Sequence, residues 1–417
     1  MDKRLLFTLM SLCMAFSSFS QIDGYFSKSV APNFRTVNGV YIGPSKKFVM
    51  VGGWPENDAI STTYKSDDLG ATWTFVLDKV DAMLNDCSFG TGSFGCTVGR
   101  SGIVYITSNS GESWDKIEIN GNAGSRDFNA VYFVDENTGF IVGGNESNDA
   151  IQTILKTTDG GKNWSIQKDN LNPWLRDVYA LDANNVFACG DGVVIKSTDG
   201  GSNWAELDLP GNASSRKFNS VWFIDENNGF VGGGHPTRDS IQTLLKTTDG
   251  GENWSIVYDS PNPMINKVYF VNQNIGYVVG DHGLILQTID GGDNWKALEI
   301  KINDGGHIHD VYFLNKKLGL FGGYGGKVLI YNDTTKTEDP NVTPSEIEIY
   351  SPIEIVGSTT ARVKGRVHPH GDSTYVKFVY GEDKLTNTVS VSSAPYTQDE
   401  WVDLNFTVEN LEPSRSI

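Results

Sequence analysis

An eight-residue pattern, Ser/Thr-x-Asp-x-Gly-x-x-Trp, recurs six times and limits the folds that this chain can adopt. The copies are 66–73, 107–114, 157–164, 197–204, 247–254 and 288–295. Asp can accept hydrogen bonds from turn amides, and Gly can adopt a backbone conformation closed to other residues. Trp can anchor the strand that follows by packing its large side chain. The pattern therefore predicts a hairpin turn that is built six times.

The segments around each copy predict four short strands. Before the third copy, the runs 130–134, 140–143 and 153–157 have strand character, and a fourth run leaves its tryptophan. Four short strands per unit are typical of a propeller blade. The tryptophans are separated by 41, 50, 40, 50 and 41 residues, so we expect long and short blades to alternate.

A seventh unit covers 309–331, where the pattern has decayed to Asn-Asp-Thr-Thr. This unit lacks a fourth strand, and the N-terminal run 24–30 can supply one. Ring closure by that strand would remove two exposed sheet edges. We therefore predict an all-β fold, a seven-bladed propeller over 22–335 whose last blade is closed by an N-terminal strand.

Composition and the first residues predict export. Lys3 and Arg4 precede the apolar run 5–16, and the small residues Ser18 and Ser20 follow, which is typical of a signal peptide over 1–20. No later run is apolar enough to span a membrane, so we expect a secreted or cell-envelope protein.

The formal charge of -18, from 33 Lys+Arg and 51 Asp+Glu, makes nucleic acid an unfavourable partner.

Three cysteines follow the signal peptide: Cys87, Cys96 and Cys189. The Gly-rich segment 87–96 is interpreted as a hairpin that sets Cys87 opposite Cys96. In an oxidising compartment this allows a disulfide, and the alternative is two half-buried thiols.

No metal or cofactor site is predicted. The cysteines are scattered, and the histidines fall in loops of different blades without the spacing of metal ligands. We interpret them as solvated loop residues: His235, His282, His307 and His309.

The tail differs in composition from the propeller. Residues 336–345 are rich in Thr, Pro and charge and predict a linker. Strand-like alternation then appears at 360–367, 375–380 and 402–408. The segments 368–371, 378–381 and 411–413 resemble fibronectin type III modules, a resemblance that implies two further strands after 417. We therefore expect 346–417 to form an incomplete β-sandwich.

The six copies resemble the Asp-box, or bacterial neuraminidase, repeat. Together with Val-Tyr-Phe-x-Asp and Gly-Phe-x-x-Gly-Gly, they are similar to photosystem II assembly and stability factor-like propellers. In those families the boxes lie at the outer rim of the blades, which implies a structural role for the Asp and Trp positions of each box. In this chain these are Asp68, Trp73, Asn109, Trp114, Asp159, Trp164, Asp199, Trp204, Asp249, Trp254, Asp290 and Trp295.

The resemblance covers the fold and leaves several functions open, since Asp-box propellers include sialidases, xyloglucan hydrolases, receptors and assembly factors. A sialidase needs three convergent arginines, whereas Arg126 and Arg216 here occupy equivalent positions of the repeat. A xyloglucan hydrolase needs a cleft between two propellers. We predict a non-catalytic binding or scaffold protein with an unknown protein or glycan partner, and a carbohydrate-active enzyme is the alternative.

The long inserts between second and third strands and the connectors between blades are expected to share one face, opposite the boxes. Two tryptophans outside the boxes fall there, and aromatic side chains commonly anchor ligands. The candidate binding residues on this face are Trp54, Asn145, Glu146, Trp174, His235 and Arg238.

Overall fold

The computed structural model describes residues 25–31, 35–54, 60–90, 92–145, 150–235, 241–298, 300 and 306–333, together with six strands of the C-terminal segment. The chain divides into two compact units, Met1–Asp333 and Thr334–Ile417. Within the described residues, helix is limited to short 3-10 turns, and no helix is long and apolar enough to cross a membrane.

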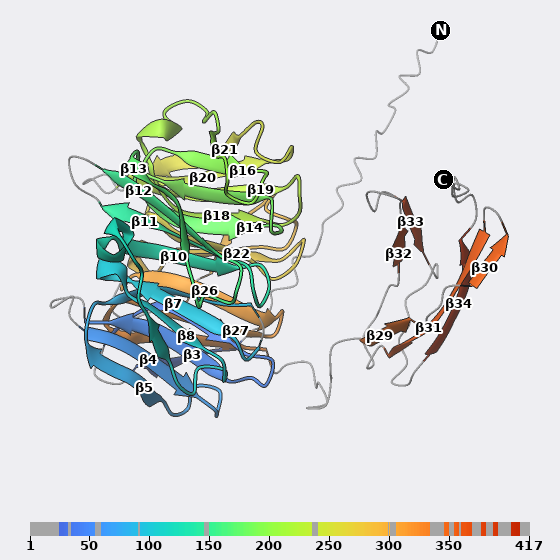
Figure 1. The fold of residues 1–417 in the computed structure, drawn as a ribbon, viewed down its shortest axis with the longest axis horizontal. Helices are drawn as coiled ribbons and strands as arrows, with labels where there is room; N and C mark the ends of the chain where they lie inside the picture. Colours follow the sequence, from blue (N-terminus) through green and yellow to red (C-terminus); the bar gives the residue numbers. More distant parts are fainter. Residues whose placement is uncertain are drawn as a thin grey trace, which may run out of the picture. The chain divides into compact units, whose positions relative to one another are not determined.

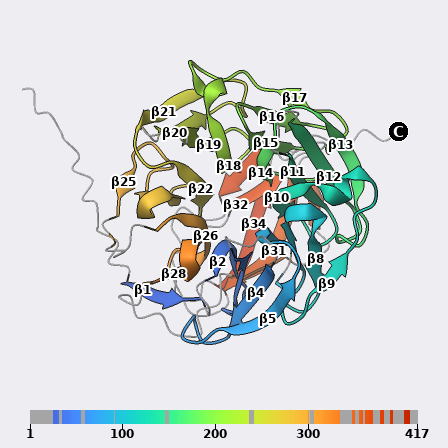
Figure 2. The same cartoon turned by 90° about the vertical axis from the view of Figure 1, so that its left-hand side faces the viewer.

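The first unit is a seven-bladed propeller, as predicted. Seven four-stranded antiparallel sheets surround a common axis, as Figure 2 shows from one face and Figure 1 from the side. Blade 1 comprises β2 (Thr36–Ile42), β3 (Phe48–Gly53), β4 (Ile60–Ser66) and β5 (Thr74–Val80), and blade 2 comprises β6 (Leu84–Phe89), β7 (Gly95–Gly99), β8 (Val104–Thr107) and β9 (Asp115–Ile117). Blade 3 comprises β10 (Asp127–Phe133), β11 (Gly139–Asn145), β12 (Ile151–Thr157) and β13 (Ser165–Leu171). Blade 4 comprises β14 (Leu175–Ala180), β15 (Val186–Gly190), β16 (Val194–Ser197) and β17 (Ala205–Glu206). Blades 5 to 7 comprise β18 (Lys217–Phe223), β19 (Gly229–His235), β20 (Ile241–Thr247), β21 (Ser255–Pro261); β22 (Ile265–Phe270), β23 (Gly276–Gly280), β24 (Ile285–Thr288), β25 (Lys296–Ala297); and β26 (Ile308–Asn315), β27 (Leu318–Gly323), β28 (Lys327–Asn332), β1 (Tyr25–Val30).

The blades alternate in length, as the tryptophan spacing predicts. The outermost strands β5, β13 and β21 have 7 residues each, whereas β9 has 3 and β17 and β25 have 2. The first strand of each blade lies at the axis, and the outermost strand lies at the rim (Figure 2).

Strand β1 closes the ring by pairing antiparallel with β28, from Tyr25 opposite Asn332 to Val30 opposite Lys327. It also contacts the next blade, because Ser29 Oγ donates to the carbonyl oxygen of Gly70 and accepts from Trp73 Nε1, both at 2.9 Å. The predicted N-terminal closure is therefore confirmed.

The hydrophobic core is divided among the blade interfaces. Each cluster of buried apolar side chains contains residues of two adjacent blades, and the last and first blades share one through Leu320 and Val40. Because every blade buries both faces against neighbours, the ring is stabilised only when it is complete.

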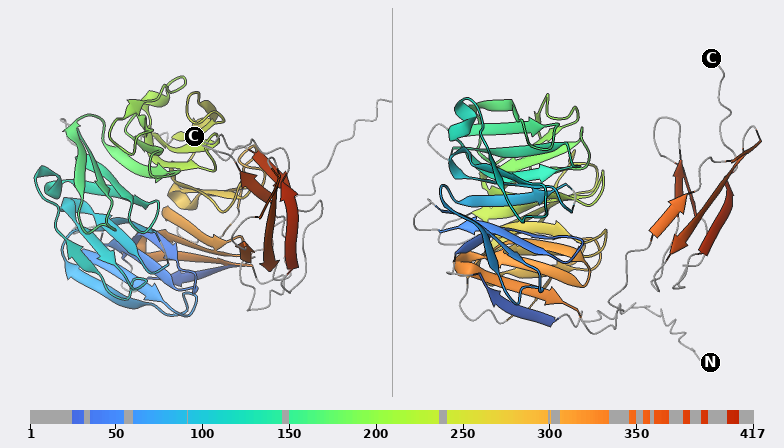
Figure 3. Two further views of the ribbon diagram at one scale, coloured as in Figure 1. Left: turned by 45° about the vertical axis from the view of Figure 1, so that its right-hand side comes forward. Right: turned by 60° about the horizontal axis from the view of Figure 1, so that its bottom comes forward.

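In the second unit, β31 (Thr360–His368) pairs with β29 (Glu346–Ile349), β30 (Glu354–Gly357) and β34 (Val402–Val408), while β32 (Lys377–Tyr380) pairs with β33 (Asn387–Ser390). Figure 3 gives two further views of these strands. The described part of this unit is therefore β-structure.

Candidate functional site in the central channel

The first strand of each blade lines the central channel, and each carries a bulge near its start. Register shifts occur between Val37 and Gly39 in blade 1 and at the equivalent place in each other blade. A bulge places consecutive side chains where a regular strand would alternate them. The bulged residues, which we call the polar ring, are Asn38, Asn85, Asn129, Arg176, Asn219, Asn266 and His309.

The polar ring lines a cavity of about 330 Å³ at the connector side of the channel, where the first strands begin. Its asparagines donate to backbone carbonyls of the next blade, as Asn129 Nδ2 does to Leu175 at 2.6 Å and Asn219 Nδ2 to Ile265 at 2.8 Å. His309 Nδ1 lies 3.0 Å from Asn38 Oδ1, and burial lowers the pKa of His309 to about 4. These side chains therefore link neighbouring blades.

A charged layer follows the polar ring. The residues after the bulge include Asp86, Asp177 and Asp310, and each carboxylate accepts a hydrogen bond from a backbone N–H of the next blade. Ser220 does the same for Val268. The acid positions thus have a structural task in holding the ring together.

Lys267 breaks this series in blade 6. Its Nζ reaches across the channel to Asp177, 3.2 Å from Oδ1 and 3.3 Å from Oδ2. The Asp177 side chain is 4% exposed and that of Lys267 is 21% exposed. The layer therefore combines three carboxyl groups with one ammonium group.

Burial shifts the pKa values of two of these carboxyl groups, Asp86 and Asp310. Burial raises the pKa of Asp86 to about 7 and that of Asp310 to about 6, although the ammonium group of Lys267 opposes both shifts. Burial alone would lower the pKa of Lys267, but the three carboxylates outweigh it and raise that pKa. Lys267 is therefore charged at neutral pH, and its charge does not compensate all three acids.

An aromatic layer lies on the box side of the charged layer. Six of the seven first strands place an aromatic side chain there, and adjacent ring centroids lie 4.8 to 5.6 Å apart along most of the circle. These side chains, called the aromatic ring, are Tyr41, Tyr132, Tyr179, Trp222, Tyr269 and Tyr312. Blade 2 has Ser88 instead, which interrupts the circle.

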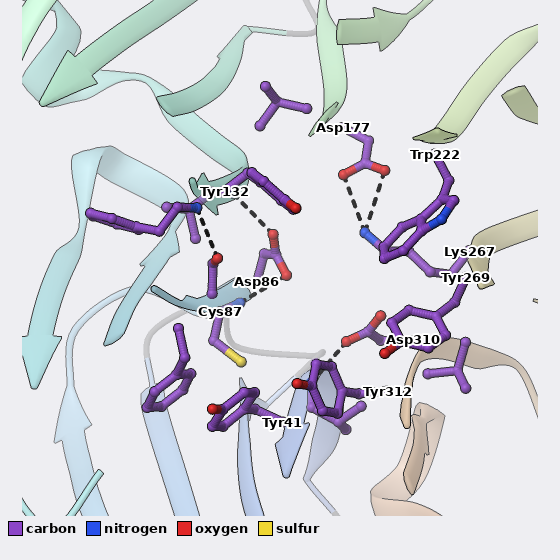
Figure 4. A pocket seen from close by; sticks show the side chains of 17 residues that line it. Tyr41, Asp86, Cys87, Tyr132, Asp177, Trp222, Lys267, Tyr269, Asp310 and Tyr312 are labelled. Atoms are coloured by element: carbon purple, nitrogen blue, oxygen red, sulfur yellow. Dashed lines mark hydrogen bonds and ion pairs between the residues drawn. The ribbon is translucent and has the colours of Figure 1, made fainter. Parts of the chain in front are cut away.

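The aromatic ring and the charged layer together enclose a cavity of about 280 Å³. Figure 4 shows Asp86, Asp177, Lys267 and Asp310 pointing into it from different sides. The site can accommodate a small group that satisfies both π-faces and carboxylates.

Four of the candidate binding residues identified from the sequence lie outside the two channel cavities. Trp54, Asn145 and His235 occupy equivalent, half-buried positions at or just after the ends of β3, β11 and β19. Trp174 is also half-buried, and the Arg176 guanidinium lies over its ring at 4.4 Å from the centroid. Glu146 and Arg238 lie outside the described residues.

The interpretation of the histidines as solvated loop residues is wrong for His309, whereas His307 precedes β26 in a loop and its side chain is 40% exposed. His309 belongs to β26 and to the polar ring. His307 Nδ1 lies 2.7 Å from Asp281 Oδ1, and its ring lies 5.4 Å from that of His282. The seventh blade thus brings His309 to Asn38 of blade 1 and His307 to Asp281 of blade 6. The sequence did not reveal these contacts, because the partners lie far apart along the chain. Among the described residues, no group of three His, Cys, Asp or Glu side chains is arranged to hold a metal.

The paired-cysteine alternative also needs correction. The hairpin forms, but Cys87 lies opposite Thr97 and Cys96 lies opposite Ser88, so the two cysteines are offset by one residue. Neighbouring strand residues point to opposite faces, and both thiols are free. The register of the hairpin, which sets Phe89 opposite Gly95, produces this offset.

Arginines of the long blades bind their own outer strands. Arg126 Nε lies 3.1 Å from Asp169 Oδ1, and Arg216 Nη2 lies 3.0 Å from Asp259 Oδ2. Arg35 pairs with Asp78 at the equivalent place. These three arginines are thus divided among alternate blades and do not converge on one ligand.

The Asp-boxes form turns between the third and fourth strands. In the third box, Thr157 Oγ1 accepts from Gly161 N and donates to Asp159, which accepts from Asn163 N at 2.9 Å. Hydrogen bonds from Asn163 lower the pKa of Asp159. Trp164 Nε1 donates to the Gly161 carbonyl at 2.9 Å. The box carboxylates are therefore engaged in closing turns.

Sequence reasoning missed the channel site, although a signal for it exists. Alignment of the first strands shows Lys267 where other blades have Asp, Ser, Ala or Gly, and Ser88 where they have Tyr or Trp. These two departures from the repeat lie in the same cavity.

Blade number, ring closure and turn structure define a seven-bladed Asp-box propeller. A family model described as photosynthesis system II assembly factor YCF48 matches residues 65–174. No curated protein matches the chain.

Solved structures similar to this chain share its fold. The structure described as YCF48 bound to D1 peptide has 19% identity and a TM-score of 0.57, covering 74% of this chain and 96% of the other. YCF48 from Cyanidioschyzon merolae has 15% identity, a TM-score of 0.57 and coverages of 74% and 98%. The WD40 repeats of RRP9 have 10% identity, a TM-score of 0.54 and coverages of 74% and 97%. The first two extend the YCF48-like character of the fold beyond the matched segment.

Proposed function

We propose that this protein is an exported, non-catalytic scaffold whose propeller binds a protein partner. The observation that carries the proposal is the structural use of the repeated charged side chains. Arg126 and Arg216 bind carboxylates of their own blades, and Asp159 and its equivalents close turns. The match to a family described as an assembly factor, and the solved YCF48 structure with a bound peptide, support a protein partner.

Export is part of the proposal and rests on residues 1–20. Cleavage before Gln21 would place the propeller in the envelope or the medium. The fibronectin-like segment 346–417 would then add a second binding module. Mass spectrometry of the protein purified from its native host tests this directly, since an N-terminus at Met1 would contradict export by this signal.

The proposed binding surface is the connector face, where Trp54 and Trp174 lie. Affinity capture from the native envelope should use the wild type, the double variant Trp54→Ala/Trp174→Ala, and Lys162→Ala, which changes an exposed residue of a box on the opposite side. We expect a partner that is retained by the wild type and Lys162→Ala and lost by the double variant. Loss with Lys162→Ala alone would place the surface on the box side.

The enzymatic alternative is tested on the same preparations. Turnover of fluorogenic glycosides or polysaccharides that is abolished by replacing one loop carboxylate would refute a non-catalytic function. We expect no such turnover, because Asp159 and its equivalents close turns, and Asp169 and Asp259 pair with arginines of their own blades.

A further inference from the structure

The cavity between the aromatic ring and the charged layer has the composition of a cation site. Its walls are phenol and indole rings, whose faces are electronegative and attract ammonium or guanidinium groups within about 6 Å. Tyr132, Trp222 and Tyr312 are half-buried rather than fully enclosed. A ligand entering from the box side would therefore pass these rings before it reached the carboxylates.

The carboxylates at the inner end are only partly neutralised. Lys267 is bonded to Asp177, which leaves Asp86 and Asp310 without a cation of their own among the described residues. Asp310 is 7% exposed, and its Oδ2 accepts from Val40 N at 2.8 Å. Figure 4 shows the Asp310 carboxylate among the side chains that line the cavity. A buried carboxylate gains most from a partner that brings the missing positive charge.

The break in the aromatic ring provides space for such a partner. Ser88 and Asp86 lie two residues apart on β6, so both face the channel. Ser88 Oγ is used by Phe133 N at 3.0 Å, and the small side chain fills less of the wall than a tyrosine would. The cavity of about 280 Å³ is large enough for the end of one long side chain.

We propose that this cavity binds the cationic end of a lysine or arginine side chain from a protein partner, with the aromatic ring around its stem and Asp86 and Asp310 facing its charge. This inference rests on the proposed function in one respect, because it takes the cation to belong to a protein partner. It assigns a ligand to the box side of the channel, separate from the connector face.

Blocked pentapeptides test the site without the natural partner. Protein labelled with ¹⁵N at tryptophan is titrated with Gly-Gly-X-Gly-Gly, in which X is lysine, arginine or norleucine, and the Trp222 indole signal is followed. Replacement Trp222→Phe identifies that signal. We expect a saturable shift with lysine or arginine and none with norleucine, whose side chain has similar length but no charge.

Two variants with the same change in net charge separate the site from general electrostatics. Asp310→Asn keeps the acceptor for Val40 N, and Asp115→Asn changes an exposed carboxylate of β9. We expect binding at least tenfold weaker in D310N, with no effect in D115N. Thermal unfolding checks that D310N is folded, and Asp86→Asn serves as the second variant if it is not.

Equal shifts with lysine, arginine and norleucine would overturn the proposal, as would equal affinity of the wild type and D310N. Failure here is distinguishable from failure of the proposed function. A partner captured through the connector face would still support a scaffold even if no peptide entered the channel.

Discussion

Replacement of Lys267 by methionine removes the only ammonium group of the charged layer while keeping an unbranched side chain. Lys267 Nζ lies 3.2 Å from Asp177 Oδ1. At an effective dielectric constant of about 20, this separation corresponds to an attraction of about 5 kcal/mol before desolvation is subtracted. Removal of one partner from a buried pair costs about 3–5 kcal/mol. Because Lys267 is 21% exposed, we expect a loss near 3 kcal/mol in the free energy of unfolding at pH 8.

The loss should depend on pH with a defined sign. In the folded protein the pKa of Asp86 is about 7 and that of Asp310 about 6, both above the ordinary value of 3.8. The folded state therefore binds more protons than the unfolded state between about pH 4 and 7, and stability falls as pH rises through this window. Lys267 lowers both pKa values, so its removal raises them further. Lys267→Met should consequently lose less stability at pH 5 than at pH 8.

Urea unfolding at pH 5 and pH 8, followed by tryptophan fluorescence, measures both effects. Lys116→Met is the control, because Lys116 Nζ lies 2.9 Å from Asp81 Oδ2 but the two side chains are 38% and 26% exposed. An exposed pair contributes about 1 kcal/mol or less. A Lys267→Met loss no larger than that of the control at pH 8, or equal at both pH values, would refute the reasoning.

Three further predictions concern the ring. Thr247→Val should cost about 1–2 kcal/mol in urea unfolding, because the buried Gly251 N–H loses its acceptor at 2.9 Å. Gly144→Ala should strongly destabilise the folded propeller, because Gly144 has φ of 139° and an added Cβ would lie 1.6 Å from the Ile151 carbonyl oxygen. Thermal unfolding measures this loss. Gly43→Ala is the control, because a Cβ added at Gly43 meets no atom closer than 3.7 Å. The thiols of Cys87, Cys96 and Cys189 should resist a thiol reagent in the native state, because burial raises their pKa. After unfolding without reductant, all three should react. If only one thiol reacted, the other two would be joined in a disulfide.

The sequence determined the architecture because the repeat records local requirements. Asp159, Gly161 and Trp164 describe one turn completely, since all of its hydrogen bonds lie within a few residues. Six such turns at alternating separations specify six blades and their lengths, and the strand-like runs within 309–331 specify the seventh. The unpaired fourth strand of the last blade, together with a spare N-terminal strand, specifies closure.

Only the tertiary structure decided what the first strands place together. Lys267 and Asp177 lie 90 residues apart, in blades that are not adjacent, and meet only because closure brings all first strands to one axis. The offset of Cys87 from Cys96 depends on the pairing register of β6 and β7, because a shift of one residue exchanges the two faces of a strand. Local sequence fixes turns and strand length, whereas the charge balance in the channel depends on contributions from every blade and exists only in the closed ring.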